Sequence, residues 1–142
     1  MRRIRALTYV LAATLLTSCG SDSGTNPGEN PLAGTFILQS VNGKGLPFST
    51  QRVGGVYTLG SSWIGFQLHG EFTQSLTVNN VPLADGTIGP ATFLAYGTFL
   101  YTASTQAVSL HRSDGIEFAG TVTIDIMTLV DVGGDSYVFK RQ

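Results

Sequence analysis

Apolar side chains recur at every second position through most of this chain, and this period constrains the fold more than any other feature of the sequence. In the clearest stretch, Ile64, Phe66 and Leu68 alternate with small or polar residues. Successive side chains of a β-strand point to opposite faces, so this period predicts a strand with one buried face. Turn residues, among them Asp114-Gly115, separate such stretches at intervals of about 8 to 12 residues, a spacing typical of all-β sandwiches and barrels.

The pattern assigns most of the chain beyond residue 33 to strands. Strands are expected at residues 34–41, 56–59, 64–68, 72–79, 93–102, 108–111, 116–122, 125–131 and 136–140. Residues 80–90 are expected to form the longest irregular segment, because Asp85-Gly86 and Gly89-Pro90 are turn markers. No segment has the apolar spacing of an amphipathic helix. We therefore predict an all-β fold, an antiparallel meander of eight or nine strands that closes into a small barrel.

Aromatic residues dominate the apolar faces of these expected strands. The candidate barrel-interior or ligand-lining residues are Phe36, Phe66, Phe72, Phe99, Tyr101, Phe118 and Tyr137. Eight strands enclose a space that side chains just fill or that holds one small ligand, so a packed core and a small apolar pocket both remain open. Gln74 also falls on the apolar side of its strand and needs a hydrogen-bond partner or a water there.

The N-terminus has the order of features found in a secretory signal. Three arginines within the first five residues precede an apolar run over residues 6–16, and small residues follow before Cys19. This run is about half the ~20 residues that a transmembrane helix needs, so residues 1–18 are expected to be a signal peptide. Cys19 is the sole cysteine of the chain and cannot form an internal disulfide.

Leu16-Thr17-Ser18-Cys19 resembles the lipobox of bacterial lipoproteins, whose cysteine is lipidated and becomes the mature N-terminus. The resemblance implies lipid attachment at Cys19 and anchoring in the bacterial cell envelope, since two or more acyl chains hold stably. Gly20 stands where inner-membrane lipoproteins usually carry aspartate, which favours the outer membrane if the host has two membranes. Residues 21–31 lack large apolar side chains, so we expect residues 19–31 to form a flexible linker and residues 32–142 the barrel domain.

Three segments of the domain are similar to small bacterial lipocalin-like and META-type domains. They are the opening run Ala33-Gly34-Thr35-Phe36-Ile37-Leu38-Gln39-Ser40-Val41-Asn42-Gly43-Lys44, then Tyr96-Gly97-Thr98-Phe99, and the closing Tyr137-Val138-Phe139-Lys140-Arg141. Phe36 stands where proper lipocalins carry the tryptophan of their G-x-W motif. The resemblance implies a lipocalin-like barrel that can hold a small hydrophobic ligand.

Charge and motif content disfavour several other functions. Without residues 1–18 the chain has five basic and nine acidic residues, a formal net charge of −4, whereas nucleic-acid binding needs a basic stripe. No Gly-x-Ser-x-Gly motif is present, and His69 and His111 fall on outward positions near turns. The two histidines have no ligand-spaced partners, so no metal site and no cofactor are expected.

From these observations we predict that the protein is a non-catalytic, membrane-anchored lipoprotein of the cell envelope. In the first hypothesis the barrel binds a small hydrophobic ligand. In the alternative, the protein is a structural or stress-protective envelope protein in the META manner, with a filled barrel and a protein partner on an outer face. No enzymatic activity is expected in either case.

Overall fold

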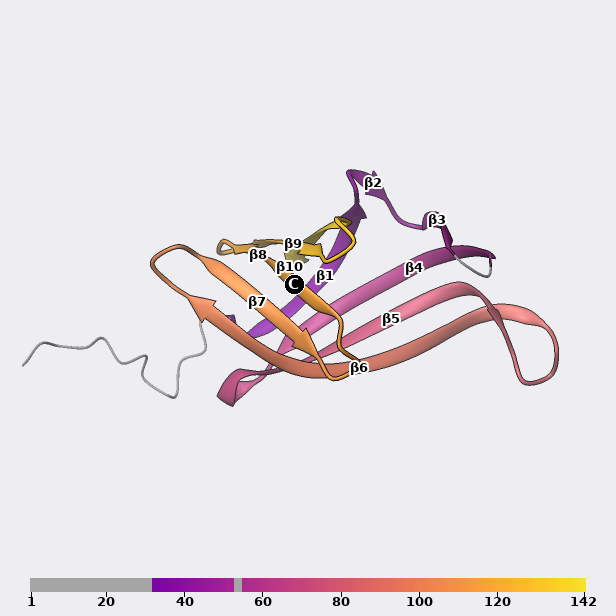
Figure 1. Ribbon diagram of the computed structural model, residues 1–142, viewed down its shortest axis with the longest axis horizontal. Helices are drawn as coiled ribbons and strands as arrows, with labels where there is room; N and C mark the ends of the chain where they lie inside the picture. Colours follow the sequence, from indigo (N-terminus) through magenta and orange to yellow (C-terminus); the bar gives the residue numbers. More distant parts are fainter. Residues whose placement is uncertain (1–31, 53–54) are drawn as a thin grey trace, which may run out of the picture.

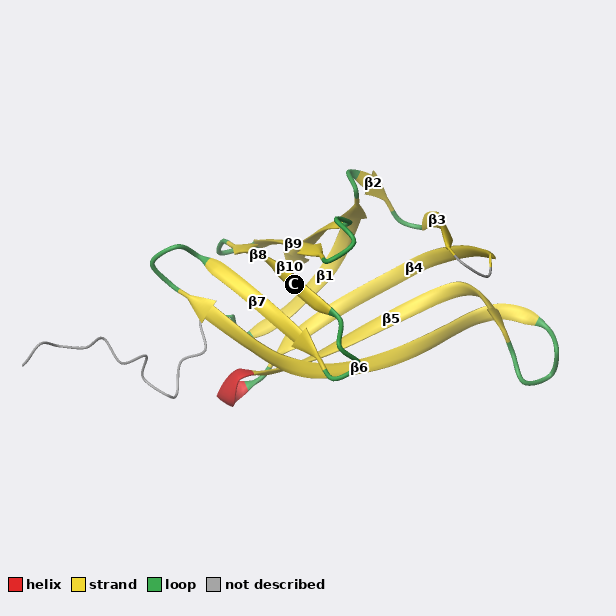
Figure 2. Ribbon diagram, in the orientation of Figure 1, coloured by secondary structure: helices red, strands yellow, loops and turns green. Residues whose placement is uncertain are grey.

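The structure is a computed structural model that describes residues 32–52 and 55–142 (Figure 1). The expected signal peptide, the lipid attachment at Cys19 and the linker lie outside the described residues. Most of the described chain is strand, with one short helical turn (Figure 2). Within the described ranges, no helix has the length and apolarity needed to cross a bilayer.

Ten strands and one 3-10 turn make up the described fold. They are β1 (Gly34–Val41), β2 (Lys44–Gly45), β3 (Phe48–Arg52), β4 (Gly55–Phe66), η1 (Leu68–Gly70), β5 (Glu71–Pro82), β6 (Ile88–Thr102), β7 (Ala107–Arg112), β8 (Glu117–Val122), β9 (Ile126–Asp131) and β10 (Ser136–Arg141). From β4 to β10 each strand pairs with the next one along the chain, and all pairs are antiparallel.

Strand β1 closes the sheet into a barrel. Its residues pair with β10 on one side and with β4 on the other, where Phe36 lies opposite Ile64. Eight strands therefore form the closed ring, and the predicted all-β antiparallel barrel is confirmed. The short strands β2 and β3 lie outside the ring, paired with β1 and β4, in a segment that the sequence pattern assigned to no strand.

The wall of the barrel is taller on one side than on the other. Strands β4, β5 and β6 have 12, 12 and 15 residues, whereas each of β7 to β10 has only six. The long strands extend well past the short ones, with the β5–β6 hairpin reaching furthest (Figure 1). One end of the barrel is consequently bounded by the tall wall together with β3 and the β9–β10 turn.

The sequence prediction of an irregular segment over residues 80–90 is wrong for most of its length. Only residues 83–87 form a loop, and the flanking residues extend β5 and β6. The register between β5 and β6 shifts between Val78 and Val81, which marks an irregularity where Asn80 is located. The Asn80 amide oxygen accepts a hydrogen bond from the Thr58 backbone N–H at 2.9 Å, and its Nδ2 donates to the Val56 carbonyl. A residue type typical of turns is thus kept in the strand by its side-chain bonds to β4.

The other end of the barrel is filled by aromatic side chains. Phe66 lies at the centre of this cluster, with its ring centroid 5.8 Å from that of Phe36, 6.3 Å from that of Phe72 and 4.9 Å from that of Phe99. The Phe36 and Phe99 rings meet Phe66 edge to face, a favourable geometry for aromatic pairs. Leu32 is buried, and Gly34, the first residue of β1, pairs with Phe66. The chain therefore enters the barrel at its filled end.

Candidate functional site

A cavity of about 310 Å³ occupies the end of the barrel opposite the aromatic cluster. Its apolar lining includes Leu59 and Val78 from the tall wall and Phe139 from β10. A neighbouring hollow of about 330 Å³ shares Arg52, Tyr57, Val78 and Phe93 with it. Drug-sized ligand pockets begin near 300 Å³, so the cavity is large enough for a small molecule.

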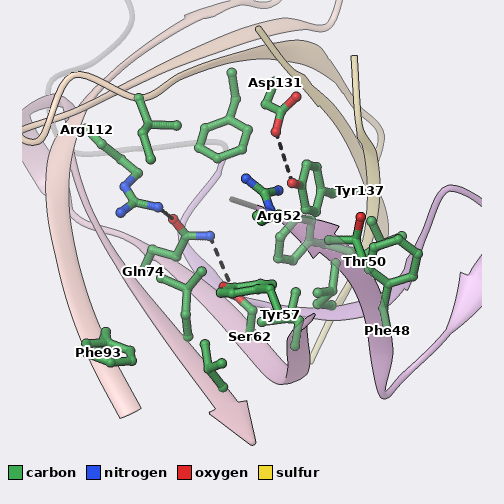
Figure 3. Close-up of a pocket in the computed structure, with 18 residues that line it drawn as sticks. Phe48, Thr50, Arg52, Tyr57, Ser62, Gln74, Phe93, Arg112, Asp131 and Tyr137 are labelled. Atoms are coloured by element: carbon green, nitrogen blue, oxygen red, sulfur yellow. Dashed lines mark hydrogen bonds between the residues drawn. The ribbon is translucent and has the colours of Figure 1, made fainter. Parts of the chain in front are cut away.

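A row of hydrogen-bonded polar side chains crosses one wall of this cavity. Arg112 Nη1 donates to Gln74 Oε1 at 3.3 Å, and Gln74 Nε2 donates to Ser62 Oγ at 3.4 Å (Figure 3). Gln74 and Ser62 are buried, and all three residues line the cavity. The polar Gln74 on an apolar strand face, noted in the sequence, thus has partners on both sides.

Arg112 is an almost enclosed charge at the end of β7. Its side chain is 12% exposed, and its guanidinium forms an ion pair with Asp114, in which Nε donates to Oδ1 at 3.1 Å. Burial raises the pKa of the Asp114 carboxyl, but hydrogen bonds from Arg112 and from the Ile116 backbone outweigh this and hold the pKa below its usual range. The Asp114 side chain is 48% exposed, so the pair spans from the cavity to the surface.

Gly97 permits this arrangement because it has no side chain. It pairs with Arg112 across β6 and β7. A Cβ atom at position 97 would overlap the His111 carbonyl oxygen and would lie 2.7 Å from a ring carbon of Phe72. Close approach of the two backbones here is therefore possible only for glycine.

A second arginine lies where the cavity and the neighbouring hollow meet. The Arg52 guanidinium carbon is 5.3 Å from the Tyr57 ring centroid, and Arg52 Nη2 is 3.4 Å from Asp135 Oδ2. Burial raises the pKa of Tyr57, and the positive charges of Arg52 and Arg112 partly counteract that rise. The positive charges of two arginines, one on β3 and one on β7, thus both lower the pKa of the Tyr57 phenol relative to the effect of burial alone.

Asp131 is the acidic residue among those that line the cavity. Its Oδ1 accepts hydrogen bonds from the backbone N–H groups of Gly133 and Asp135 at 2.9 and 3.0 Å. Its Oδ2 accepts from the Tyr137 hydroxyl at 3.0 Å (Figure 3). Burial, then the negative charge of Asp131, raise the pKa of Tyr137 above its ordinary value. Both oxygens of the Asp131 carboxylate therefore accept hydrogen bonds, one from the backbone of the following turn and the other from Tyr137.

The seven aromatic residues singled out in the sequence divide between the two ends of the barrel. Phe36, Phe66, Phe72 and Phe118 are buried, and Phe99, Tyr101 and Tyr137 are partly buried and pack against the core. Only Phe118 and Tyr137 line the cavity, and their rings meet edge to face with centroids 5.7 Å apart. The other five pack into the core outside its lining.

The two histidines are on the outer surface. His69 is exposed in η1, and His111 Nδ1 lies 3.0 Å from Glu117 Oε1 on the neighbouring strand. No group of three potential metal-ligating His, Cys, Asp or Glu side chains occurs in the part of the chain that the structure describes.

Comparison of the chain with known proteins found no matching family model, no matching curated protein and no matching solved structure. The site therefore has to be interpreted from its own geometry.

Sequence reasoning missed Arg112, Arg52 and Tyr57 as cavity residues. A signal for Arg112 was present, because the alternation that places Val108 and Leu110 inside continues to position 112. Arg52 lies on β3, which carries no period-two pattern of its own, so no comparable signal was available there.

Proposed function

We propose that this chain is a lipid-anchored protein of the bacterial cell envelope, held by lipid on Cys19, whose barrel binds a small hydrophobic ligand without catalysing a reaction. The cavity of about 310 Å³ in the open end of the barrel is the observation that carries the proposal of ligand binding. Its lining combines apolar side chains with a few polar groups, the composition typical of small-molecule sites.

The proposed anchor is supported by the sequence around Cys19 and by the resemblance to bacterial lipoproteins. Placement in the outer membrane is part of the proposal for a host that has two membranes. A non-catalytic role is supported by the position of His69 and His111 on the outer surface, away from the cavity. The similarity of three segments to lipocalin-like domains supports the proposal that the barrel binds a small hydrophobic ligand.

Native mass spectrometry of the chain extracted from its own host tests both parts of the proposal. We expect an acyl mass on Cys19 and a bound small molecule that dissociates on activation. Leu76 lines the cavity, so Leu76→Phe is expected to reduce the ligand-bound fraction by filling the site. Leu94→Phe on the outer face of β6 is the matched control and should leave ligand binding unchanged. A wild-type chain with neither lipid nor ligand would overturn the proposal.

An apolar patch on the outer face favours a second candidate function, the binding of an envelope protein partner. The register of β1, β4, β5 and β6 aligns the exposed Ile37, Trp63 and Leu94 in one row across the outside of the barrel, with the buried Ser75 between Trp63 and Leu94. Trp63 is 38% exposed and Leu94 56%. Leu94→Asp should abolish cross-linking to such a partner while leaving ligand binding intact, and unchanged cross-linking would argue against this function.

A further inference from the structure

We propose that the ligand is a single-chain amphiphile with an acidic head group, and that Arg112 binds this head group inside the barrel. The inference rests on the proposed function of the cavity as a ligand site. It concerns the chemical class of the ligand, which the volume of the cavity alone does not define.

The enclosure of Arg112 is the first observation. An arginine side chain that is only 12% exposed is largely removed from water, and its charge is stable there only with well-placed acceptors. Its three hydrogen bonds, one to Gln74 and two to Asp114, use three of the five N–H groups that arginine carries. An acceptor placed in the cavity would complete this set, and charge-assisted bonds to an anion are the strongest form available.

The second observation is that two arginine side chains, Arg112 and Arg52, which carry hydrogen-bond donors only, line the cavity. The acceptor oxygen of Gln74 is occupied by Arg112, and its amide donates to Ser62. Tyr57 adds a hydroxyl group, and the positive charges of both arginines partly counteract the rise that burial causes in its pKa. A ligand that presents acceptors, and best a negative charge, complements this set.

The acidic residue of the lining does not oppose such a ligand strongly. Both carboxylate oxygens of Asp131 already accept hydrogen bonds, from the backbone of Gly133 and Asp135 and from Tyr137. Asp114 and Asp135 lie in turns at the rim, each paired with an arginine. Of these two, Asp114 competes directly with an incoming anion for Arg112.

Apolar side chains that could contact the hydrocarbon part of the ligand line both the cavity and the neighbouring hollow. Leu59, Val78 and Phe93 line the cavity, and Val78 and Phe93 continue into the hollow bounded by Val81 and Pro82. Phe93 is 49% exposed, so a hydrocarbon chain lying against it would also remove apolar surface from water. The two spaces together fit a head group at Arg112 with an unbranched tail along the tall wall.

Calorimetric titration with matched eight-carbon probes tests this inference. The full chain in lipid nanodiscs is titrated with octanoate, 1-octanol and octylammonium, and titrations into protein-free nanodiscs are subtracted. Octanoate is expected to bind at least about tenfold more tightly than octanol, the size of effect that one good charge-assisted hydrogen bond gives. Octyl phosphate in a fourth titration distinguishes a phosphate head group from a carboxylate.

Two variants with opposite expected effects assign the binding to Arg112. Arg112→Gln should weaken octanoate by about tenfold or more and leave octanol within about twofold. Asp114→Asn keeps the size and the turn contact of the side chain but removes the competing charge, so it should strengthen octanoate binding. Lys140→Gln, which removes an exposed cation from the outer face of β10, is the control and should change neither probe.

The possible results are distinguishable. Tighter octanoate binding that falls with Arg112→Gln and rises with Asp114→Asn supports the inference, even if Arg112→Gln proves too unstable to titrate and only Asp114→Asn can be measured. Equal binding of octanoate and octanol, tighter binding of octylammonium, or no response to Asp114→Asn overturns it while leaving apolar ligand binding in place. Binding of no probe at all would overturn the proposed ligand-binding function itself.

Discussion

The guanidinium carbon of Arg141 lies 4.6 Å from the centroid of the Phe36 ring, where the last strand meets the first at the filled end of the barrel. Arg141 Nε also donates to the Ile124 carbonyl at 2.6 Å, and Nη1 donates to the Ala33 carbonyl. One side chain on β10 thus connects the entry to β1, the β8–β9 turn and the fully buried Phe36.

Replacement of Arg141 should destabilise the barrel through this end. We expect Arg141→Gln to lower the free energy of unfolding by about 1–3 kcal/mol, from the lost cation–π contact and the lost charge-assisted hydrogen bonds. Urea denaturation measures the difference. Lys140→Gln at the adjacent outward position is the control, and an equal effect of both variants would show that the contact with Phe36 contributes nothing.

Phe66 should be the most sensitive residue of the filled end, because it touches three other rings. Phe66→Ala is expected to cost about 3–5 kcal/mol through lost apolar burial and the cavity left behind. Gln67→Ala, at an exposed position with a surface hydrogen bond to Thr73, should change stability by about 0.5 kcal/mol or less. Small and equal effects in thermal denaturation would contradict the assignment of strand faces.

Substitution of Gly97 by a larger residue should destabilise the barrel in a different way, through added rather than lost side-chain volume. The methyl group of Gly97→Ala would overlap the His111 carbonyl oxygen, so β6 and β7 would have to separate at about 1–3 kcal/mol or more. Gly45→Ala is the matched control, because a Cβ atom there meets nothing within 4 Å. Chemical denaturation of both variants compares them, and equal stabilities would mean that the two strands tolerate a wider spacing.

The fold was predictable because the period-two pattern is local. Phe36 and Phe72 are buried where the alternation places them, and Gln74 points inward with them. The sequence gives no comparable local sign of a bulge. Between Leu38 and Ser40 the β1–β10 register shifts, so Val41, rather than Ser40, faces the core after Leu38.

The candidate site was less predictable because it depends on relations between distant strands. That Arg112 reaches Gln74 requires β7 to lie close to β6 at Gly97, which no local pattern encodes. The cavity also depends on the unequal heights of the barrel wall. The turn markers at residues 80–90 concealed this feature, since they suggested a loop where β5 and β6 in fact continue.

Tyr137 should make the barrel sensitive to alkaline pH. Burial and the adjacent Asp131 carboxylate raise the pKa of its hydroxyl above the usual value near 10. Above pH 10 the unfolded chain therefore releases this proton while the folded chain keeps it, and linkage requires stability to fall as pH rises. Tyr137→Phe loses the hydrogen bond to Asp131, so it should be less stable than the wild type at pH 8. The variant has no such proton to release, so the difference between the two proteins should narrow between pH 10 and pH 12. Urea denaturation across this range measures both, and parallel pH profiles would show that the folded Tyr137 ionises as easily as an unfolded tyrosine.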